Sequence, residues 1–284
     1  MRILRIVVAA ALAAATAVAG LASFAAPASA DVPASNPIQY VTQYFWGGST
    51  SFAVSGTVSC PSGSRVVSSG ASASGGAGQL TAIAPDINSF TSATATAFAP
   101  GYLQITVGCE AAAAMSEVTT RTIQLPYGSG FRRGVVYCPA GMHAFGGGGY
   151  MVKPFGIGGF SRDSVQMVSN SVSADGTGWT FAATTYNSND APVITTQCAP
   201  LRGSYVSQTG TAAPDFNQVN TYGSCPPGYT ALSGGVYLSM PNGSEVTNGF
   251  LDYSIPASGN RWYVDGVALS NTANKLVALE QCIQ

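Results

Sequence analysis

Residues 60–73 read CPSGSRVVSSGASA, and the chain returns to this stretch twice. Residues 138–151 read CPAGMHAFGGGGYM, and residues 225–238 read CPPGYTALSGGVYL. The three stretches share the pattern C-P-x-G-x-x-[AV]-[VFL]-[SG]-[SG]-G, and their starts lie 78 and then 87 residues apart. A pattern that recurs at such spacing indicates three copies of one structural unit.

Each copy also closes on a shared pattern. Trp179 begins WTFAATTY with Cys198 following by 19 residues, and Trp262 begins WYVDGVAL with Cys282 following by 20. In the first copy the predicted equivalent is Phe90, with Cys109 following by 19. An aromatic residue that recurs once per copy favours packing in the core over stacking on a ligand. The predicted copies span residues 31–115, 116–203 and 204–284 and form one compact domain.

All six cysteines lie after residue 59: Cys60, Cys109, Cys138, Cys198, Cys225 and Cys282. An even count in an exported chain predicts three disulfides, although six cysteines permit fifteen connectivities. Pairing the opening and closing cysteine of each copy gives every copy the same bridge. Pairing each closing cysteine with the next copy is the alternative.

The local patterns predict strands nearly throughout. Runs such as VTQYF, TTRTIQL and RWYVDGVAL alternate with period two, and Gly, Pro, Asn and Asp clusters separate them. The glycines at 146–149 and 234–235 predict bulges or a close backbone approach between neighbouring sheets, since no helix follows to complete a phosphate-binding loop. The expected fold is all-β with pseudo-threefold repeats, a β-prism rather than three small sandwiches in a row.

This pattern resembles the vitelline membrane outer layer proteins, in which three sheets form the faces of a prism about a pseudo-threefold axis. The resemblance covers residues 36–284 and rests on the Cys-Pro-x-Gly openings and the strand-ending cysteines. The copies here are longer, and they lack the acidic, asparagine-containing stretch before the closing cysteine. Secreted bacterial proteins with C-P-x-G…G-G repeats are also similar. The resemblance implies the prism fold and agrees with carbohydrate binding.

The first thirty residues have the features of a signal peptide. Arg2 and Arg5 precede an apolar, alanine-rich stretch, and Ala28-Ser29-Ala30 is a small-residue cleavage site. We expect cleavage after Ala30, with an uncleaved anchor as the alternative, and no integral membrane segment in the remainder. The predicted location is secreted and extracellular.

Charge and composition exclude several function classes. Charged residues make up 8% of the chain and the formal net charge is −1, so a phosphate-tracking, nucleic-acid-binding surface is not expected. The nearest cysteines are 27 residues apart and there is one histidine, so neither a metal site nor a cofactor is predicted. A surface rich in hydroxyl and amide groups suits binding of neutral polar ligands, and equally an inert coat.

No catalytic motif is present. The chain has no G-x-S-x-G segment, and a Ser-His-Asp triad would depend on His143, whose role stays open. Asp163, Asp175 and Asp252 are interpreted as turn formers or as partners of arginines. No catalytic residue is therefore assigned.

Four aromatic residues are the candidate binding residues: Tyr44 and Trp46 in a dense cluster before the first cysteine, and Tyr127 and Tyr186 at expected loop edges. Partial burial between strands is the alternative for each. The leading hypothesis is a secreted, non-catalytic binding protein for a glycan or cell-surface polymer. The first alternative is a structural or interaction protein of the cell envelope or of an exported complex, with a secreted protein partner. The second alternative is a secreted hydrolase.

Overall fold

A computed structural model describes residues 38–47, 53–75, 78–112, 117–152, 165–186, 188–201, 203–213, 216–240, 242–258, 260–269 and 274–284. The predicted signal peptide lies outside the described residues, as does Asp163. Within the described part the structure contains no helix long and apolar enough to cross a membrane.

The described strands form three sets of six. The first copy contains β1 (Gln39–Trp46), β2 (Ala53–Ser59), β3 (Ser64–Ala73), β4 (Gln79–Pro85), β5 (Ser92–Phe98) and β6 (Tyr102–Ala111). The second contains β7 (Thr119–Gln124), β8 (Gly130–Tyr137), β9 (His143–Val152), β10 (Val165–Val172), β11 (Gly178–Thr185) and β12 (Ala191–Ala199). The third contains β13 (Tyr205–Ala213), β14 (Gln218–Ser224), β15 (Thr230–Ser239), β16 (Gly249–Ala257), β17 (Arg261–Ala268) and β18 (Asn274–Ile283).

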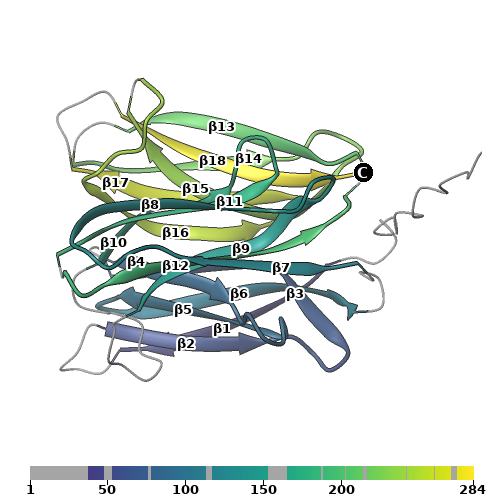
Figure 1. Cartoon of the computed structure of the whole chain (residues 1–284). Helices are drawn as coiled ribbons and strands as arrows, with labels where there is room; N and C mark the ends of the chain where they lie inside the picture. Colours follow the sequence, from purple (N-terminus) through teal and green to yellow (C-terminus); the bar gives the residue numbers. More distant parts are fainter. Residues whose placement is uncertain are drawn as a thin grey trace, which may run out of the picture.

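Three six-stranded sheets are each shared between two copies. Sheet I has the order β1-β6-β3-β16-β17-β14, sheet II β2-β5-β4-β9-β12-β7, and sheet III β13-β18-β15-β10-β11-β8. Each copy therefore gives three strands to one sheet and three to another, and these two half-sheets contact each other within the copy. Figure 1 shows the first copy at the bottom, the second in the middle and the third at the top. The all-β, pseudo-threefold prediction is confirmed, and the alternative of three separate sandwiches is wrong.

The last glycine of the repeated pattern lies where two copies join within a sheet. Strands β3, β9 and β15 pair there with β16, β4 and β10 of the neighbouring copy. A side-chain carbon at Gly70, Gly148 or Gly235 would collide with a backbone carbonyl of that neighbouring strand. This close approach lies within one sheet and explains why glycine recurs at this position. The predicted approach between neighbouring sheets is found at Gly146, where a side-chain carbon would collide with the Val67 carbonyl of β3.

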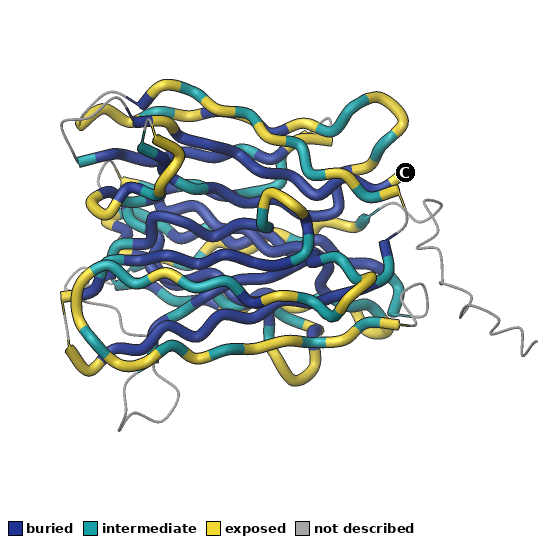
Figure 2. Tube along the Cα trace, turned by 45° about the horizontal axis from the view of Figure 1, so that its top comes forward, coloured by how far each residue is buried: buried dark blue, intermediate teal, exposed yellow. Residues whose placement is uncertain are grey.

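The disulfides connect different sheets within each copy. The pairs are Cys60–Cys109, Cys138–Cys198 and Cys225–Cys282, so the predicted internal pairing is confirmed. In each pair the first cysteine follows a strand of one sheet and the second lies in a strand of another. The core fills the space between the half-sheets, and Figure 2 shows the central strands buried and the turns exposed.

Trp179 and Trp262 are core residues, as predicted, with 1% of each side chain exposed. The Trp179 indole lies against Gly147, where a side chain would collide with the ring, and its Nε1 donates to Asn170 Oδ1 at 2.9 Å. The Trp262 Nε1 donates in the same way to Ser254 Oγ at 3.0 Å. A buried indole N–H needs such an acceptor.

The predicted equivalence of Phe90 with these tryptophans is wrong. Ala93 pairs with Val58 as Trp179 pairs with Val136, so alanine occupies the aromatic position in the first copy. Phe90 lies in the turn before β5 with a φ of 53°. The count of residues to the closing cysteine misled the alignment because the loop between β5 and β6 is short.

Candidate functional site

Two of the predicted binding residues lie together on the outer face of sheet I, the face turned away from the core. Tyr44 and Trp46 project from the edge strand β1 and are 55% and 74% exposed, whereas Val41 and Phe45 pack against the core. Both exposed rings meet Tyr102 of β6 edge-on, at centroid distances of 5.3 and 5.4 Å. The strand alternation of β1 thus separates a core side from an aromatic side.

The other two predicted residues lie in the second copy. Tyr127 precedes β8 and Tyr186 follows β11, and both are exposed. The Tyr186 hydroxyl donates to Gln166 Oε1 at 3.3 Å. Because β8 and β11 belong to sheet III, the structure does not bring the four predicted residues onto one surface.

Further aromatic residues extend the surface across sheet I. Tyr253 on β16 and Tyr263 on β17 have ring centroids 5.7 Å apart, and Tyr222 on β14 lies 4.9 Å from Tyr263. The Arg261 guanidinium covers the Tyr222 ring at 4.8 Å. Burial raises the pKa of the Tyr253 hydroxyl, and the Tyr102 hydroxyl adds to the rise across the intervening strand β3. We call this set the aromatic face: Tyr44, Trp46, Tyr102, Tyr253, Tyr263 and Tyr222.

Two carboxyl groups lie among these rings. Asp252 occupies the bulge of β16 and Asp265 lies on β17 opposite Tyr253. Nε2 of Gln218 donates to Oδ2 of both, at 3.1 and 3.2 Å. The Asp side chains are 5% and 4% exposed, and within the described residues the Oδ1 atom of each has no hydrogen-bond partner. The interpretation of Asp252 as a turn former or arginine partner is wrong, because the bulge aims it at a second acid.

Burial is the main reason that this pair holds protons tightly. It raises the pKa of Asp252 to about 8, with the charge of Asp265 adding to the shift. It also raises the pKa of Asp265 to about 6, although hydrogen bonds from Gln218 and Tyr263 act in the opposite direction. Near neutral pH the pair therefore carries about one proton.

The same positions are uncharged in the other two sheets. In sheet III the bulge and its opposite residue are Val168 and Ala182, and in sheet II they are Thr81 and Thr96. The Thr81 hydroxyl donates to the Thr96 carbonyl at 3.1 Å. One scaffold thus presents different chemistry on its three outer faces.

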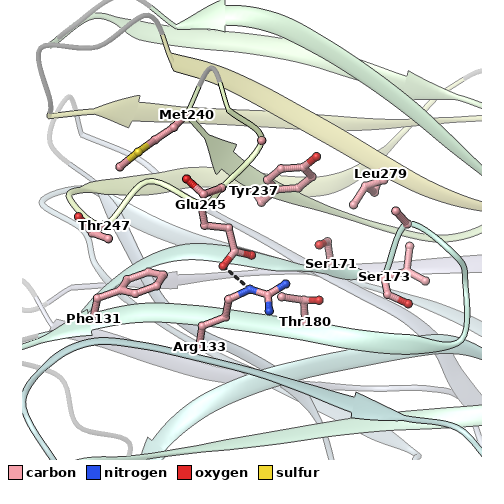
Figure 3. Close-up of a pocket in the computed structure, with 14 residues that line it drawn as sticks. Phe131, Arg133, Ser171, Ser173, Thr180, Tyr237, Met240, Glu245, Thr247 and Leu279 are labelled. Atoms are coloured by element: carbon pink, nitrogen blue, oxygen red, sulfur yellow. Dashed lines mark ion pairs between the residues drawn. The ribbon is translucent and has the colours of Figure 1, made fainter.

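The outer face of sheet III contains a pocket of about 580 Å³ between the second and third copies. Arg133 on β8 reaches across to Glu245, in the loop after β15, with Nε 2.6 Å from Oε2 (Figure 3). Burial raises the pKa of Glu245, and the Arg133 charge partly opposes this. Phe131, Tyr237, Met240 and Leu279 supply apolar walls, and Ser171, Ser173 and Thr180 supply hydroxyl groups.

Two other residues considered from the sequence, Asp175 and His143, have a local role or none assigned. Asp175 is a turn former, as predicted: it accepts hydrogen bonds from Ser173 Oγ and Thr177 N, which lower its pKa. His143 begins β9, pairs with Ala199 and is partly buried. The described residues include one cluster of three side chains of metal-ligating types, but two of its members form the Cys225–Cys282 disulfide and cannot act as thiolate ligands.

Sequence reasoning missed Tyr102, Tyr253, Tyr263 and the acid pair. These residues come together because β6, β16 and β17 lie in one sheet that joins the first and third copies. Aligning the copies strand by strand offers one usable signal: both acids stand where the other copies have neutral residues. The chain matches no protein-family model and no curated protein sequence.

Proposed function

We propose that this protein is a secreted, non-catalytic binding protein for a glycan or cell-surface polysaccharide, and that the aromatic face is its binding surface. The supporting observation is a band of rings on one face of sheet I, in two groups that lie on β1 and β6 and on β16, β17 and β14, with β3 between them. Six strands spaced about 4.8 Å apart extend this band over roughly 24 Å. That length accommodates several consecutive sugar units.

Polar groups between the rings support a sugar ligand. Thr42 and Thr106 hydroxyls lie 2.9 Å apart on the same face, and Gln104 Nε2 donates to Thr106 Oγ1 at 3.5 Å. Neutral donors and acceptors beside ring faces match the alternation of hydroxyl groups and C–H faces on a sugar. The low charge of the chain agrees with a neutral ligand.

The compartment follows from the covalent structure. Three disulfides indicate an oxidising, extracellular environment. Secretion through a signal peptide at residues 1–30 is part of the proposal. We assign no bond-breaking step to Asp252 and Asp265 because both are almost fully buried beneath the rings.

The test is retention of the oxidised protein on a panel of insoluble polysaccharides, with free oligosaccharide as competitor. Trp46→Ala and Tyr102→Ala should each weaken binding roughly tenfold or more, since ring stacking surfaces concentrate binding energy in few residues. Tyr137→Ala is the matched control, because Tyr137 is equally prominent, at 61% exposed, on sheet III. Unchanged binding by both test variants would refute this location.

A secreted protein partner is the second candidate. Tyr and Trp are enriched at protein interfaces, and the exposed rings on β1 also fit such a surface. Capture of a protein partner that free sugar does not displace, together with no polysaccharide retention, would favour this candidate.

A further inference from the structure

The pocket on sheet III differs from the aromatic face in charge as well as in position. Arg133 pairs with Ala182, and the residues in the equivalent register are Asn220 opposite Asp265 in sheet I and Ser55 opposite Thr96 in sheet II. A guanidinium therefore replaces an amide and a hydroxyl at the same place on the scaffold. This substitution creates a cation beside a cavity.

Glu245 orients the guanidinium and leaves part of it open. The pair joins Nε of Arg133 to Glu245, and the two terminal nitrogens point away from Glu245, towards Ser171 and Thr180 (Figure 3). The Arg133 side chain remains 49% exposed, whereas Glu245 is 9% exposed. Fixing one edge of the planar group presents its other N–H groups as a fork suited to a carboxylate.

The loop that carries Glu245 is held in place by its own hydrogen bonds. Met240 N donates to Ser244 O at 2.7 Å, and Val246 N donates to Leu238 O at 2.9 Å. Glu245 also forms a β-bridge with Ser239. The carboxylate that positions Arg133 is therefore preorganised and does not depend on a ligand to order it.

The rest of the lining indicates what is attached to the anionic group. Phe131 and Tyr237 provide rings, while Ser171 and Thr180 provide hydroxyl groups on the side towards which the terminal nitrogens point (Figure 3). A cavity of about 580 Å³ holds a compact ligand of one or two rings. Apolar walls with several hydroxyl groups and one cationic fork match a ring that carries both hydroxyls and a carboxylate.

We propose that this pocket is a second binding site, which takes a carboxylate-bearing sugar unit such as a uronic acid, with Arg133 binding the carboxylate and Glu245 positioning Arg133. The site lies on a different sheet from the aromatic face and does not depend on the proposed function there. Arg133 contacts the ligand, and Glu245 acts through Arg133.

The test is calorimetric titration of the oxidised protein with trigalacturonate and with its fully methyl-esterified form, which keeps the rings and removes the charge. We expect the acid to bind at least roughly tenfold more tightly than the ester, because the ester cannot accept the paired, charge-assisted hydrogen bonds. Equal affinity for both, or no binding of the acid, would overturn the proposal.

Variants locate the site. Arg133→Gln should weaken trigalacturonate binding roughly tenfold or more, and Arg133→Lys should recover only part of it, because a lysine lacks the fork. Arg132→Gln is the matched control: it removes the same charge one residue away, where the guanidinium donates to Pro126 O. A loss of binding in Arg132→Gln equal to that in Arg133→Gln would show general attraction and overturn the assignment.

A further variant and a further ligand test whether the pocket is the binding site and whether it recognises a sugar. Tyr137→Ala changes neither the pocket nor the aromatic face, and it should leave trigalacturonate binding unchanged. A neutral tripeptide, which offers a carboxylate without sugar rings, should bind much more weakly than trigalacturonate. Equal binding of the tripeptide would overturn the assignment to a sugar. Thermal unfolding of each variant confirms that it is folded.

Discussion

Asp252 and Asp265 accept hydrogen bonds from one nitrogen atom, Nε2 of Gln218, at 3.1 and 3.2 Å. This amide and the Tyr263 hydroxyl, which donates to Asp265 at 3.3 Å, do not offset two buried negative charges, so the pair retains a proton at neutral pH. The pKa values of about 8 and about 6 both lie above the ordinary value of 3.8. Between about pH 4 and about pH 8 the folded chain therefore binds more protons than the unfolded chain.

The first prediction is that stability falls as the pH rises through this range. Asp252→Asn removes the group with the larger shift, so it should raise the free energy of unfolding at pH 8 by on the order of 2 kcal/mol. At about pH 4.5 the same substitution should have little effect, because the native acid is already protonated there. Urea unfolding with intact disulfides at both pH values measures this.

Asp175→Asn is the control for the direction in which the free energy of unfolding changes at pH 8. Hydrogen bonds from Ser173 and Thr177 lower the pKa of Asp175, so its replacement should reduce stability at pH 8. An Asp252→Asn variant with the same pH profile as the parent would contradict the interpretation of the pair.

The second prediction concerns Glu280, which is fully buried between the half-sheets of the third copy. Burial raises its pKa to about 8, and within the described residues neither carboxylate oxygen has a hydrogen-bond partner. The first copy has Val107 in the equivalent position, two residues before its closing cysteine. Glu280→Val should therefore stabilise the protein at pH 8, by about 1–3 kcal/mol. A loss of stability would indicate an unrecognised role for the carboxyl group.

The third prediction tests the packing of indole on glycine. Trp262 lies against Gly234, so Gly234→Ser should force the ring to move and cost about 1–3 kcal/mol. In the first copy the equivalent residues are Ala93 and Ser69, with no indole present. The reverse change, Ser69→Gly, should cost no more than about 1 kcal/mol in urea unfolding. Similar losses of stability in Gly234→Ser and Ser69→Gly would show that the indole does not determine the effect of the substitution.

The fourth prediction concerns the covalent links between sheets. Replacing Cys138 and Cys198 together by serine opens a loop with a sequence separation of 60 residues. The expected loss is about 4 kcal/mol in the chain-entropy model. Denaturant unfolding of the double variant measures the loss, and a change below about 1 kcal/mol would show that the sheets are held without the link.

Much of the architecture was predictable because it depends on residues with strict local requirements. The cysteines, the seam glycines Gly70, Gly148 and Gly235, and the two core tryptophans each fill a position that few other residues can occupy. The internal disulfide pairing followed from giving every copy the same bridge. The equivalence of Phe90 was wrong because spacing alone cannot place a residue within a strand.

The candidate site was only half predictable. Tyr44 and Trp46 are adjacent in a strand and form an obvious cluster, but Tyr253 and Asp265 reach that surface only because sheet I combines the first and third copies. Nothing local in the sequence shows which copies share a sheet. Asp265 follows Asp252 by thirteen positions, and the β16 bulge that brings them together has no glycine to mark it.

The sharing of sheets also constrains how such a chain diversifies after gene duplication. Each copy forms half of two outer faces. The surface residues of one copy therefore lie beside residues of both other copies. The acid pair is contributed wholly by the third copy and shares sheet I with rings from the first, whereas the Arg133–Glu245 pair needs residues from the second and third. The three copies thus provide three pairwise combinations, and a binding specificity on one outer face does not require the same residues on the others.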